Sequence, residues 1–298
     1  MISVRHIRDY SGQAWMVVAK IIILAVPAIM IYVLFDKSLP LLNDNGFLNI
    51  ISGDEWKPTA GSFGFKPFII SSLYVSVLAI VLAAPICVLS AVYLSEYAHR
   101  RILKGMQPVI DILAGIPSVV YGVWGILFIV PFVRNVVAPA LGMESTGYSI
   151  LAGGLVLAVM VIPFVLNILL ELFSTIPNEL RDASLAMGAT RWEMVKVSVL
   201  RKTAPGILSA IGLGWARAIG ETIAVLMVVG NTVKIPDSMV SPGYPLPALI
   251  ANNYGEMMSI PDYDSALMLA ALLLLIITVV FNVLMRLLIA RFSKNKSL

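Results

Sequence analysis

Long apolar runs constrain this sequence more than any other feature. Of its 298 residues, 59% are hydrophobic and only 13% are charged, and the mean hydropathy is +0.92. A soluble domain carries about 25% charged residues. A helix that crosses a bilayer needs about 20 mainly apolar residues, and its backbone polar groups must be paired within the protein. The sequence therefore predicts an all-α, polytopic membrane protein.

Six such runs make the chain a single transmembrane domain, residues 1–298. The predicted spans are residues 14–35, 67–97, 108–133, 148–172, 205–231 and 264–289. The first run is too long for a signal-peptide core and no small-residue cleavage site follows it, so we expect it to be retained. The segments 36–66 and 234–262 have no helical period and are expected to be loops. The third span is rich in glycine and proline, which favours a place inside the bundle, with a break near residues 115–118.

Lysine and arginine are unevenly distributed among the predicted loops. Fifteen of the 21 lie at the N-terminal end, in the turn 99–104, in the segment 173–203 and at the C-terminal end. Five lie in the other loops, and Arg217 lies inside a span. Because cytoplasmic loops are enriched in these residues, both termini and the segment 173–203 are predicted to be cytoplasmic. The isoelectric point near 9.1 follows from this topology and requires no nucleic-acid partner.

The segment 173–203 is a long polar stretch between two predicted spans. Pro177 suits the start of a helix over residues 178–187, and Gly188 suits the left-handed residue after its end. Thr190 and Glu193 have the spacing of a capping box, so a second helix is expected from Arg191. Apolar residues recur at helical spacing on this second helix and form a stripe along one face. They are Trp192, Val195 and Val199. The pattern alone fits a helix–glycine–helix projection or an amphipathic segment lying on the lipid surface.

Two charges lie inside the fifth predicted span. Arg217 follows Pro205 by twelve residues, about 18 Å of helix rise, which is near the middle of a bilayer. A central arginine costs on the order of 3 kcal/mol on insertion scales. Glu221 comes four residues later, so in a continuous helix the two side chains share a face and can pair. The pair could be a buried salt bridge that fixes helix register, or an anion pathway in which the guanidinium fork contacts phosphate oxygens.

The first of these segments resembles a motif of a known family. Asp182, Ala183 and Gly188 resemble the E-A-A-x3-G motif of permease subunits of ATP-binding-cassette importers, where this segment is the coupling helix that docks on the ATPase subunit. The residues that the resemblance assigns to ATPase coupling are Asp182, Ala183, Gly188 and Arg191. The sequence departs from the family pattern where Asp182 replaces glutamate, Ser184 replaces the second alanine, and Arg201 replaces a proline.

Three other stretches resemble the phosphate-specific permeases of that family, in particular the C-type permease. They are residues 94–97 (LSEY), 115–122 (GIPSVVYG) and 217–224 (RAIGETIA). The resemblance implies a type I importer permease in a prokaryotic plasma membrane, working with a second permease, two ATPase subunits and an extracytoplasmic phosphate-binding protein. The residues it implies for the substrate pathway or gate are Ser118, Arg217, Glu221 and Thr222. Any ATP and Mg²⁺ would then be used by the partner ATPase.

Several other functions are disfavoured by the residues that are missing. The sequence has no Gly-x4-Gly-Lys-Ser/Thr loop, so ATP hydrolysis is expected in a partner and not in this chain. It has one cysteine, Cys87, and two histidines, His6 and His99, which argues against a disulfide, a metal site or a catalytic centre. A permease for molybdate or sulfate remains an alternative. A self-sufficient secondary transporter is disfavoured because no inverted repeat is evident.

Overall fold

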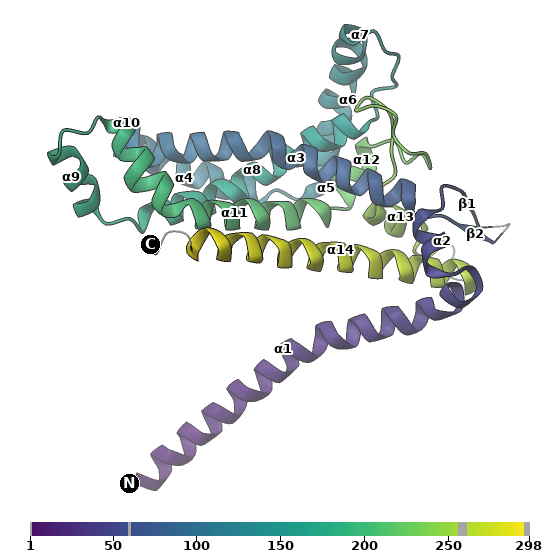
Figure 1. The fold of residues 1–298 in the computed structure, drawn as a ribbon, viewed down its shortest axis with the longest axis horizontal. Coiled ribbons are helices and arrows are strands. Elements are labelled where there is room, and N and C mark those ends of the chain that lie inside the picture. Colours follow the sequence, from purple (N-terminus) through teal and green to yellow (C-terminus); the bar gives the residue numbers. More distant parts are fainter. Residues whose placement is uncertain (1, 59–60, 256–260, 295–298) are drawn as a thin grey trace.

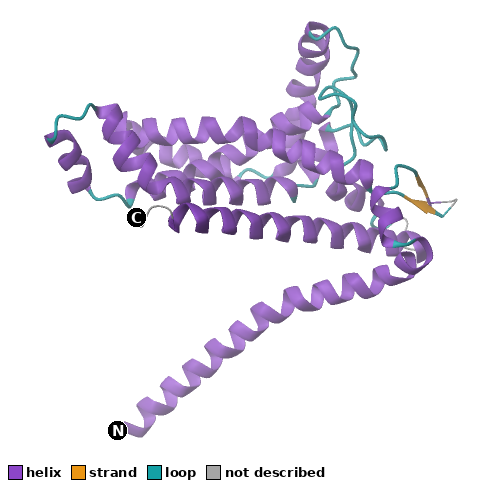
Figure 2. Ribbon diagram, in the orientation of Figure 1, coloured by secondary structure: helices purple, strands orange, loops and turns teal. Residues whose placement is uncertain are grey.

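Almost every regular element of the described residues is a helix, and the long helices other than the first lie side by side in one bundle (Figure 1). The computed structural model describes residues 2–58, 61–255 and 261–294. The α-helices are α1 (Ile2–Asn45), α2 (Phe47–Ser52), α3 (Lys66–Val92), α4 (Arg100–Gly115), α5 (Ser118–Trp124), α6 (Val130–Phe132), α7 (Ala138–Ala140), α8 (Ile150–Ser174), α9 (Asn178–Ala186), α10 (Arg191–Met194), α11 (Arg201–Ile219), α12 (Ile223–Val228), α13 (Leu246–Asn253) and α14 (Pro261–Lys294). The π-helical segments are η2 (Tyr93–Tyr97), η3 (Gly125–Ile129), η4 (Val133–Val137) and η5 (Val195–Leu200). A small antiparallel hairpin pairs β1 (Trp56–Lys57) with β2 (Ser62–Phe63) (Figure 2).

The helical content and length confirm the predicted class. Within the described ranges, five helical segments are long and apolar enough to cross a membrane. They are Gly12–Asn43, Lys66–Tyr97, Ser118–Ala140, Ile150–Ser174 and Asp262–Arg291. None of the apolar window of the first is buried within this chain, because α1 diverges from the bundle and meets α14 only near its C-terminal end (Figure 1).

The centre of the bundle is the contact between α3 and α8. The buried residues of α3 recur at every fourth position, which places them in one ridge along the helix. This ridge consists of Ser71, Val75, Ala79, Ala83, Cys87 and Ala91. Its small side chains let α8 approach closely, as is usual for helices packed in a membrane. α11 packs against both α3 and α8 and lies along the same core.

A second core lies at the end of the bundle that carries the hairpin. The Trp56 ring sits edge-on between the rings of Phe63, Phe65 and Phe68 at centroid distances of 4.9 to 5.4 Å. The ring of Tyr263, at the start of α14, adds a fifth member at 5.9 Å. These aromatic contacts tie the hairpin to the first turns of α3 and α14.

This second core explains why the two predicted loops are wrong. The segment 36–66 contains the last turns of α1, the helix α2 and the hairpin, and the segment 234–262 contains α13. Leu41 and Ile50 are 4% and 2% exposed, and Leu246 and Leu249 of α13 are fully buried. Burial of these apolar side chains stabilises helices that local sequence preferences do not specify.

Two predicted spans have different bounds in the structure. The predicted break in span 108–133 is confirmed: α4 ends at Gly115, Ile116 and Pro117 are extended, and α5 begins at Ser118. Residues 108–115 therefore belong to the amphipathic helix α4, and the candidate span runs over Ser118–Ala140. The expectation of one continuous helix over 205–231 is wrong, because residues 220–222 form a turn between α11 and α12.

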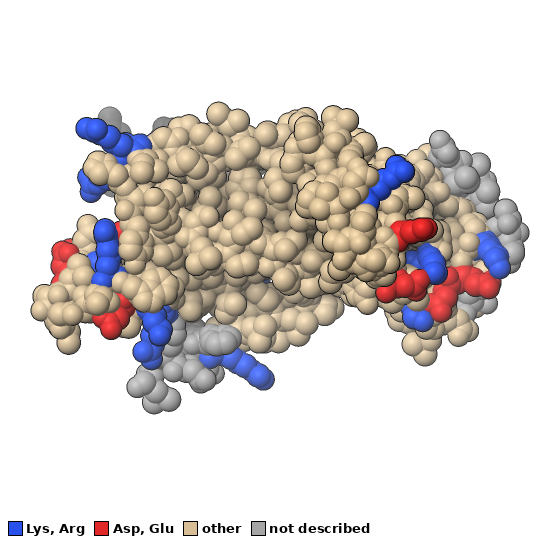
Figure 3. Space-filling model, turned by 90° about the horizontal axis from the view of Figure 1, so that it is seen from above, with Lys and Arg blue, Asp and Glu red and all other residues tan. Residues whose placement is uncertain are grey.

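Charged side chains gather at the two ends of the bundle (Figure 3). On the face shown, the middle of the molecule lacks them, and side chains of both signs occur at each end. The opposite end carries α9 and α10, which project beyond the bundle, together with the last turns of α14 (Figure 1). An apolar band between two charged ends is the distribution that a bilayer requires.

Candidate functional site

Arg217 lies near the C-terminal end of α11, and its side chain is exposed on the surface of the bundle. Its guanidinium carbon is 4.9 Å from the centre of the Phe164 ring of α8, within cation–π range. The aromatic ring holds the cation at the bundle surface while its N–H groups stay available. An exposed guanidinium can therefore bind an anion directly.

The predicted ion pair between Arg217 and Glu221 is wrong. Because α11 ends at Ile219, the two residues do not share the face of one continuous helix. No salt bridge between described residues joins Arg217 to Glu221. Glu221 Oε1 instead accepts a 3.5 Å hydrogen bond from the backbone N–H of Ala224, in the first turn of α12. The carboxylate thus caps the second half of the broken helix.

Ser118 and Thr222 stand at the starts of two packed helices. Ser118 is the first residue of α5, and Thr222 is the N-cap residue of α12. Gly122 of α5 faces Ala224 and Met227 of α12. Gly125, just beyond α5, faces Val228 at the end of α12, so the two helices run in the same direction. The two breaks, near Pro117 and at Gly220, consequently lie at the same end of this pair.

A chain of polar side chains that sequence analysis missed joins α4 to α8. Gln107 Nε2 donates to Asn167 Oδ1 at 3.1 Å, and Asn167 Nδ2 donates to Asp111 Oδ1 at 3.0 Å. Asn167 lies one helical turn beyond Phe164, which holds Arg217. Gln107 and Asn167 also line a cavity of about 550 Å³. The signal that could have found them is the polar spacing 107, 111 on α4 and the single amide in the apolar sequence of α8.

The helix–glycine–helix projection predicted over 173–203 is confirmed. We call residues 178–194, from the start of α9 to the end of α10, the projection. Its first helix, α9, has no buried residue, and Gly188 has the expected left-handed φ of +85° with no atom near its Cβ position. Asp182 and Ala183 are exposed on α9. The projection therefore offers a free surface to a partner.

The second helix of the projection begins as predicted. Thr190 and Glu193 form both hydrogen bonds of a capping box ahead of Arg191. The bonds from the Thr190 backbone N–H and then from its hydroxyl lower the pKa of the Glu193 carboxyl. The Arg191 guanidinium lies 5.2 Å from the centre of the Tyr97 ring. The predicted stripe is only partly correct, because Val195 and Val199 are buried but Trp192 is 53% exposed.

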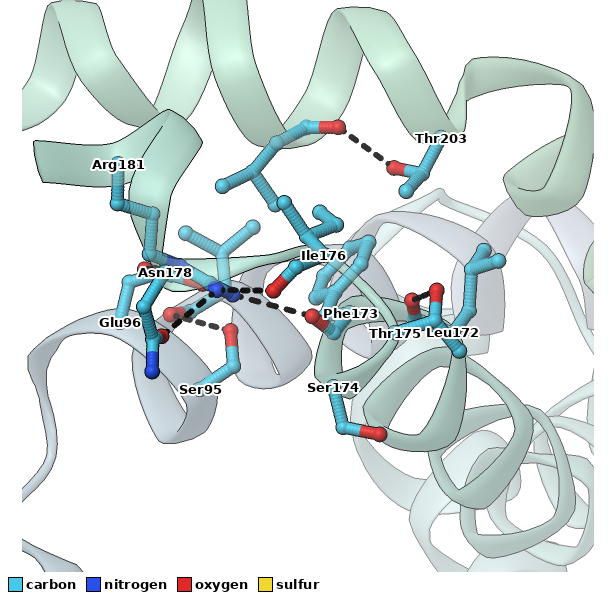
Figure 4. A network of polar contacts seen from close by, with 12 residues as sticks. Ser95, Glu96, Leu172, Phe173, Ser174, Thr175, Ile176, Asn178, Arg181 and Thr203 are labelled. Atoms are coloured by element: carbon cyan, nitrogen blue, oxygen red, sulfur yellow. Dashed lines mark hydrogen bonds and ion pairs between the residues drawn. The ribbon is translucent and has the colours of Figure 1, made fainter. Parts of the chain in front are cut away.

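Arg181 of α9 is the centre of a network that sequence analysis missed (Figure 4). Its Nε and Nη2 both donate to the Glu96 carboxylate, with a shortest distance of 2.8 Å. Nη2 also donates to the carbonyl of Phe173 at 3.0 Å, and Nη1 donates to that of Ile176 at 2.6 Å. The side chains of Glu96 and Arg181 are only 4% and 16% exposed. Glu96 belongs to the LSEY stretch, but no sequence spacing connects it to a residue 85 positions away.

The described residues contain no group of three or more histidine, cysteine, aspartate or glutamate side chains that could hold a metal ion. Cys87 is buried, and its Sγ lies 3.6 Å from the carbonyl oxygen of Ile162 in α8. This thiol belongs to the packed ridge of α3. The candidate site thus has two parts. One is the guanidinium of Arg217 near two helix breaks, and the other is the exposed projection at one end of the bundle.

Together these features define a membrane permease: a bundle of bilayer-length helices with a broken helix pair and a helical projection beyond one end. Residues 83–294 match the model of the binding-protein-dependent transport system inner membrane component. The chain belongs to that family, whose members are the membrane component of a transporter and not an enzyme. The resemblance read from the E-A-A-type motif is thereby confirmed.

Named relatives agree with this family, and a solved structure shares the fold. The phosphate transport system permease protein PstC of Xylella fastidiosa strain 9a5c is 35% identical over 256 residues, which cover 81% of this chain and 78% of the relative. The probable ABC transporter permease protein YqgH of Bacillus subtilis strain 168 is 33% identical over 291 residues, or 96% of this chain and 93% of the relative. A chain of the inward-facing MetNI methionine ABC transporter is similar in fold, with a TM-score of 0.57 and 19% identity over 74% of this chain and 93% of that chain.

Proposed function

We propose that this protein is the permease subunit of an ATP-driven phosphate importer, and that it forms the translocation pathway together with a second permease subunit. The observation that carries the proposal is Arg217, an exposed guanidinium on a bundle of apolar helices, held over an aromatic ring. Phosphate oxygens match the planar fork of a guanidinium. Relatives at 31–35% identity that carry the name phosphate transport system permease support this substrate.

The pathway runs past the two helix breaks. Ser118 and Thr222 begin the paired helices α5 and α12, and their hydroxyl groups are neutral hydrogen-bond donors for an anion. The Glu221 carboxylate caps α12, so its negative charge is not paired with Arg217. Six spans are then counted by treating α11 and α12 as one broken helix, which is a usual way to build a transport site inside a membrane.

The projection couples this subunit to the ATPase. Asp182, Ala183, Gly188 and Arg191 are exposed on it, and a docking surface must be free in the isolated subunit. Two ATPase subunits would bind and hydrolyse ATP with Mg²⁺ on the cytoplasmic side. The bias of lysine and arginine also predicts that both termini lie on this side. An extracytoplasmic phosphate-binding protein would deliver the anion at the opposite end. No cofactor is assigned to this chain.

The alternative is a permease for another tetrahedral oxyanion, because a guanidinium also binds sulfate and molybdate. The experiment is ATP-dependent uptake of labelled phosphate by the reconstituted complex, with molybdate and sulfate as competitors. Phosphate uptake that is resistant to both competitors supports the proposal. Uptake of sulfate or molybdate in preference to phosphate would mean that this other oxyanion is the substrate. Uptake without ATP would exclude an ATP-driven importer.

A further inference from the structure

Arg181 connects three segments that are far apart in the sequence. It belongs to α9, its carboxylate partner Glu96 lies in η2 at the end of α3, and its carbonyl partners Phe173 and Ile176 lie at and just beyond the end of α8 (Figure 4). Asn178 Oδ1, 3.3 Å from Nη1, completes the set of acceptors. One side chain therefore holds the projection to two of the bundle's central helices.

The Arg181 guanidinium and its hydrogen-bond acceptors, which we call the Arg181 fork, border two cavities. Cavities of about 550 Å³ and about 370 Å³ are both lined by Arg181, Ser95 and Ser174. No residue of α9 is buried. α9 itself therefore contributes little apolar packing to this junction, and the polar bonds of Arg181 are a direct side-chain link from α9 to the ends of α3 and α8.

A second polar contact attaches α9 elsewhere. Ser184 Oγ lies 2.6 Å from Ser198 Oγ of η5, which continues into α11. This contact keeps the projection folded but does not reach α3 or the end of α8. Losing the Arg181 contacts would thus leave α9 attached to the α11 side, with the Arg191–Tyr97 contact of α10 as the remaining side-chain contact between the projection and the end of α3.

We propose that Arg181 is a positioning residue that makes α9, the end of α3 and the end of α8 move as one body when the ATPase displaces the projection. The proposal rests on the proposed function, since it requires an ATPase docked on α9. Guanidinium is suited to the task because its fixed fork binds a carboxylate with two N–H groups while others reach carbonyl oxygens. A lysine ammonium is a point charge and cannot hold all of these acceptors in one geometry.

Substitutions of Arg181 and of its partner Glu96 should reduce coupled transport to different extents. Arg181→Lys loses the carbonyl contacts and the bidentate geometry, and we expect the phosphate transported per ATP hydrolysed to fall by about tenfold or more. Glu96→Gln keeps the shape and one acceptor oxygen while Arg181 retains both carbonyls, so its loss should be smaller, about threefold. Arg286→Lys is the matched control, because Arg286 is an exposed arginine in the last turns of α14.

The test uses the reconstituted complete transporter, with each variant normalised to the ATPase that copurifies. A role limited to stability would reduce the amount of complex but leave the transport-to-hydrolysis ratio of assembled complexes unchanged. Wild-type ratios in both Arg181→Lys and Glu96→Gln would overturn the proposal. If the wild-type complex transports no oxyanion with ATP, it is the proposed function that fails, so the two failures are distinguishable.

Spin labels provide a readout independent of transport. Cysteines at the exposed positions Leu185 of α9 and Tyr93 of η2 report the distance between the two elements with and without trapped ATP. In the wild type, we expect the same distance with and without trapped ATP. In Arg181→Lys, we expect a broader distribution of distances. A wild-type distance that changes with nucleotide would show that the two elements do not move together, and would refute the proposal.

Discussion

Arg217 and Glu221 act as two separate charges, although they are four residues apart. The turn at Gly220 separates them, so the guanidinium lies over Phe164 while the carboxylate caps α12. Two oppositely charged residues that contact each other show a large interaction energy in a double-mutant cycle, whereas the effects of substituting two independent residues are additive. The structure therefore changes what is expected of variants at these two positions.

Arg217→Ala and Glu221→Ala should each reduce phosphate uptake, and their effects should multiply. The interaction free energy from the double-mutant cycle should be within about 0.5 kcal/mol of zero. The measurement is uptake by both single variants and the double variant, normalised to assembled complex, with Arg286→Ala, at an exposed arginine of α14, as control. Recovery of uptake in the double variant would contradict this, because it would indicate a register-fixing salt bridge.

The sequence could supply the identity of these residues but not their geometry. Arg217 stands out because a charge in an apolar run is rare, and Gly188 because its neighbours cap helices on both sides. The Arg181 fork could not be found in this way, since Glu96 is 85 residues distant and nothing in the spacing brings the two together. Only the packing of α3 against α8 sets the position of Glu96 beneath the projection.

Among the elements, the projection depends on a left-handed glycine. Gly188→Val would place a Cβ on a residue with φ of +85°, at a cost of roughly 1–2 kcal/mol. Nothing lies within 4 Å of that Cβ, so the strain is local and the protein should still insert. ATPase association or coupled transport should fall. A variant with normal transport and a normal content of ATPase would show that the projection is not the coupling element.

The capping box of α10 predicts a measurable pKa. The hydrogen bonds from Thr190 lower the folded pKa of Glu193, so the stabilisation is present above the ordinary pKa of a glutamate and is lost as pH falls through the folded value. Thr190→Val removes the hydroxyl bond at 2.7 Å and leaves the backbone bond at 2.8 Å. The Glu193 pKa, followed by NMR of the labelled carboxyl, should rise part of the way to its ordinary value. An unchanged pKa would mean that the hydroxyl bond is not formed.

Close approach of α11 to α8 provides a test of the bundle itself. A Cβ on Gly214 would lie 2.5 Å from Val165 Cγ2 of α8, so Gly214→Ala should destabilise the protein by about 1–3 kcal/mol through overpacking. Gly105 of α4 has nothing within 4 Å of its Cβ position, and Gly105→Ala should stabilise by about 0.5–1 kcal/mol through helix propensity. Thermal unfolding in detergent compares the two. Equal melting temperatures would contradict the close packing of α11 on α8.

Helix breaks differed in how well local sequence could predict them. The break before α5 was predictable because proline forces the preceding residue out of helical conformation, and Ile116 is extended ahead of Pro117. The break at Gly220 was not, since Gly220 has a negative φ of −86° that any residue can adopt and one glycine in an apolar run is tolerated in a helix. Packing of α12 against α5 determines where the second helix begins.

For the molecule as a whole, the apolar band between charged ends fixes which surfaces water can reach but not which end is inside. The orientation rests on the bias of lysine and arginine toward the end that carries the projection and the last turns of α14. This end holds α9 and α10, and the opposite end holds α2, the hairpin and α13. A reversed protein would present the projection to the binding protein and not to an ATPase.

Labelling of single cysteines in intact cells decides between the two orientations. Ser52 of α2 is exposed at one end, and Met187 of the projection is 89% exposed at the other. An impermeant maleimide added from outside should modify Ser52→Cys at once and Met187→Cys only after the membrane is opened. The native Cys87 is fully buried, so it should stay unmodified in both, and Cys87→Ala in the same background controls for it. Immediate labelling at Met187 with protection at Ser52 would reverse the topology and remove the projection as a cytoplasmic docking site.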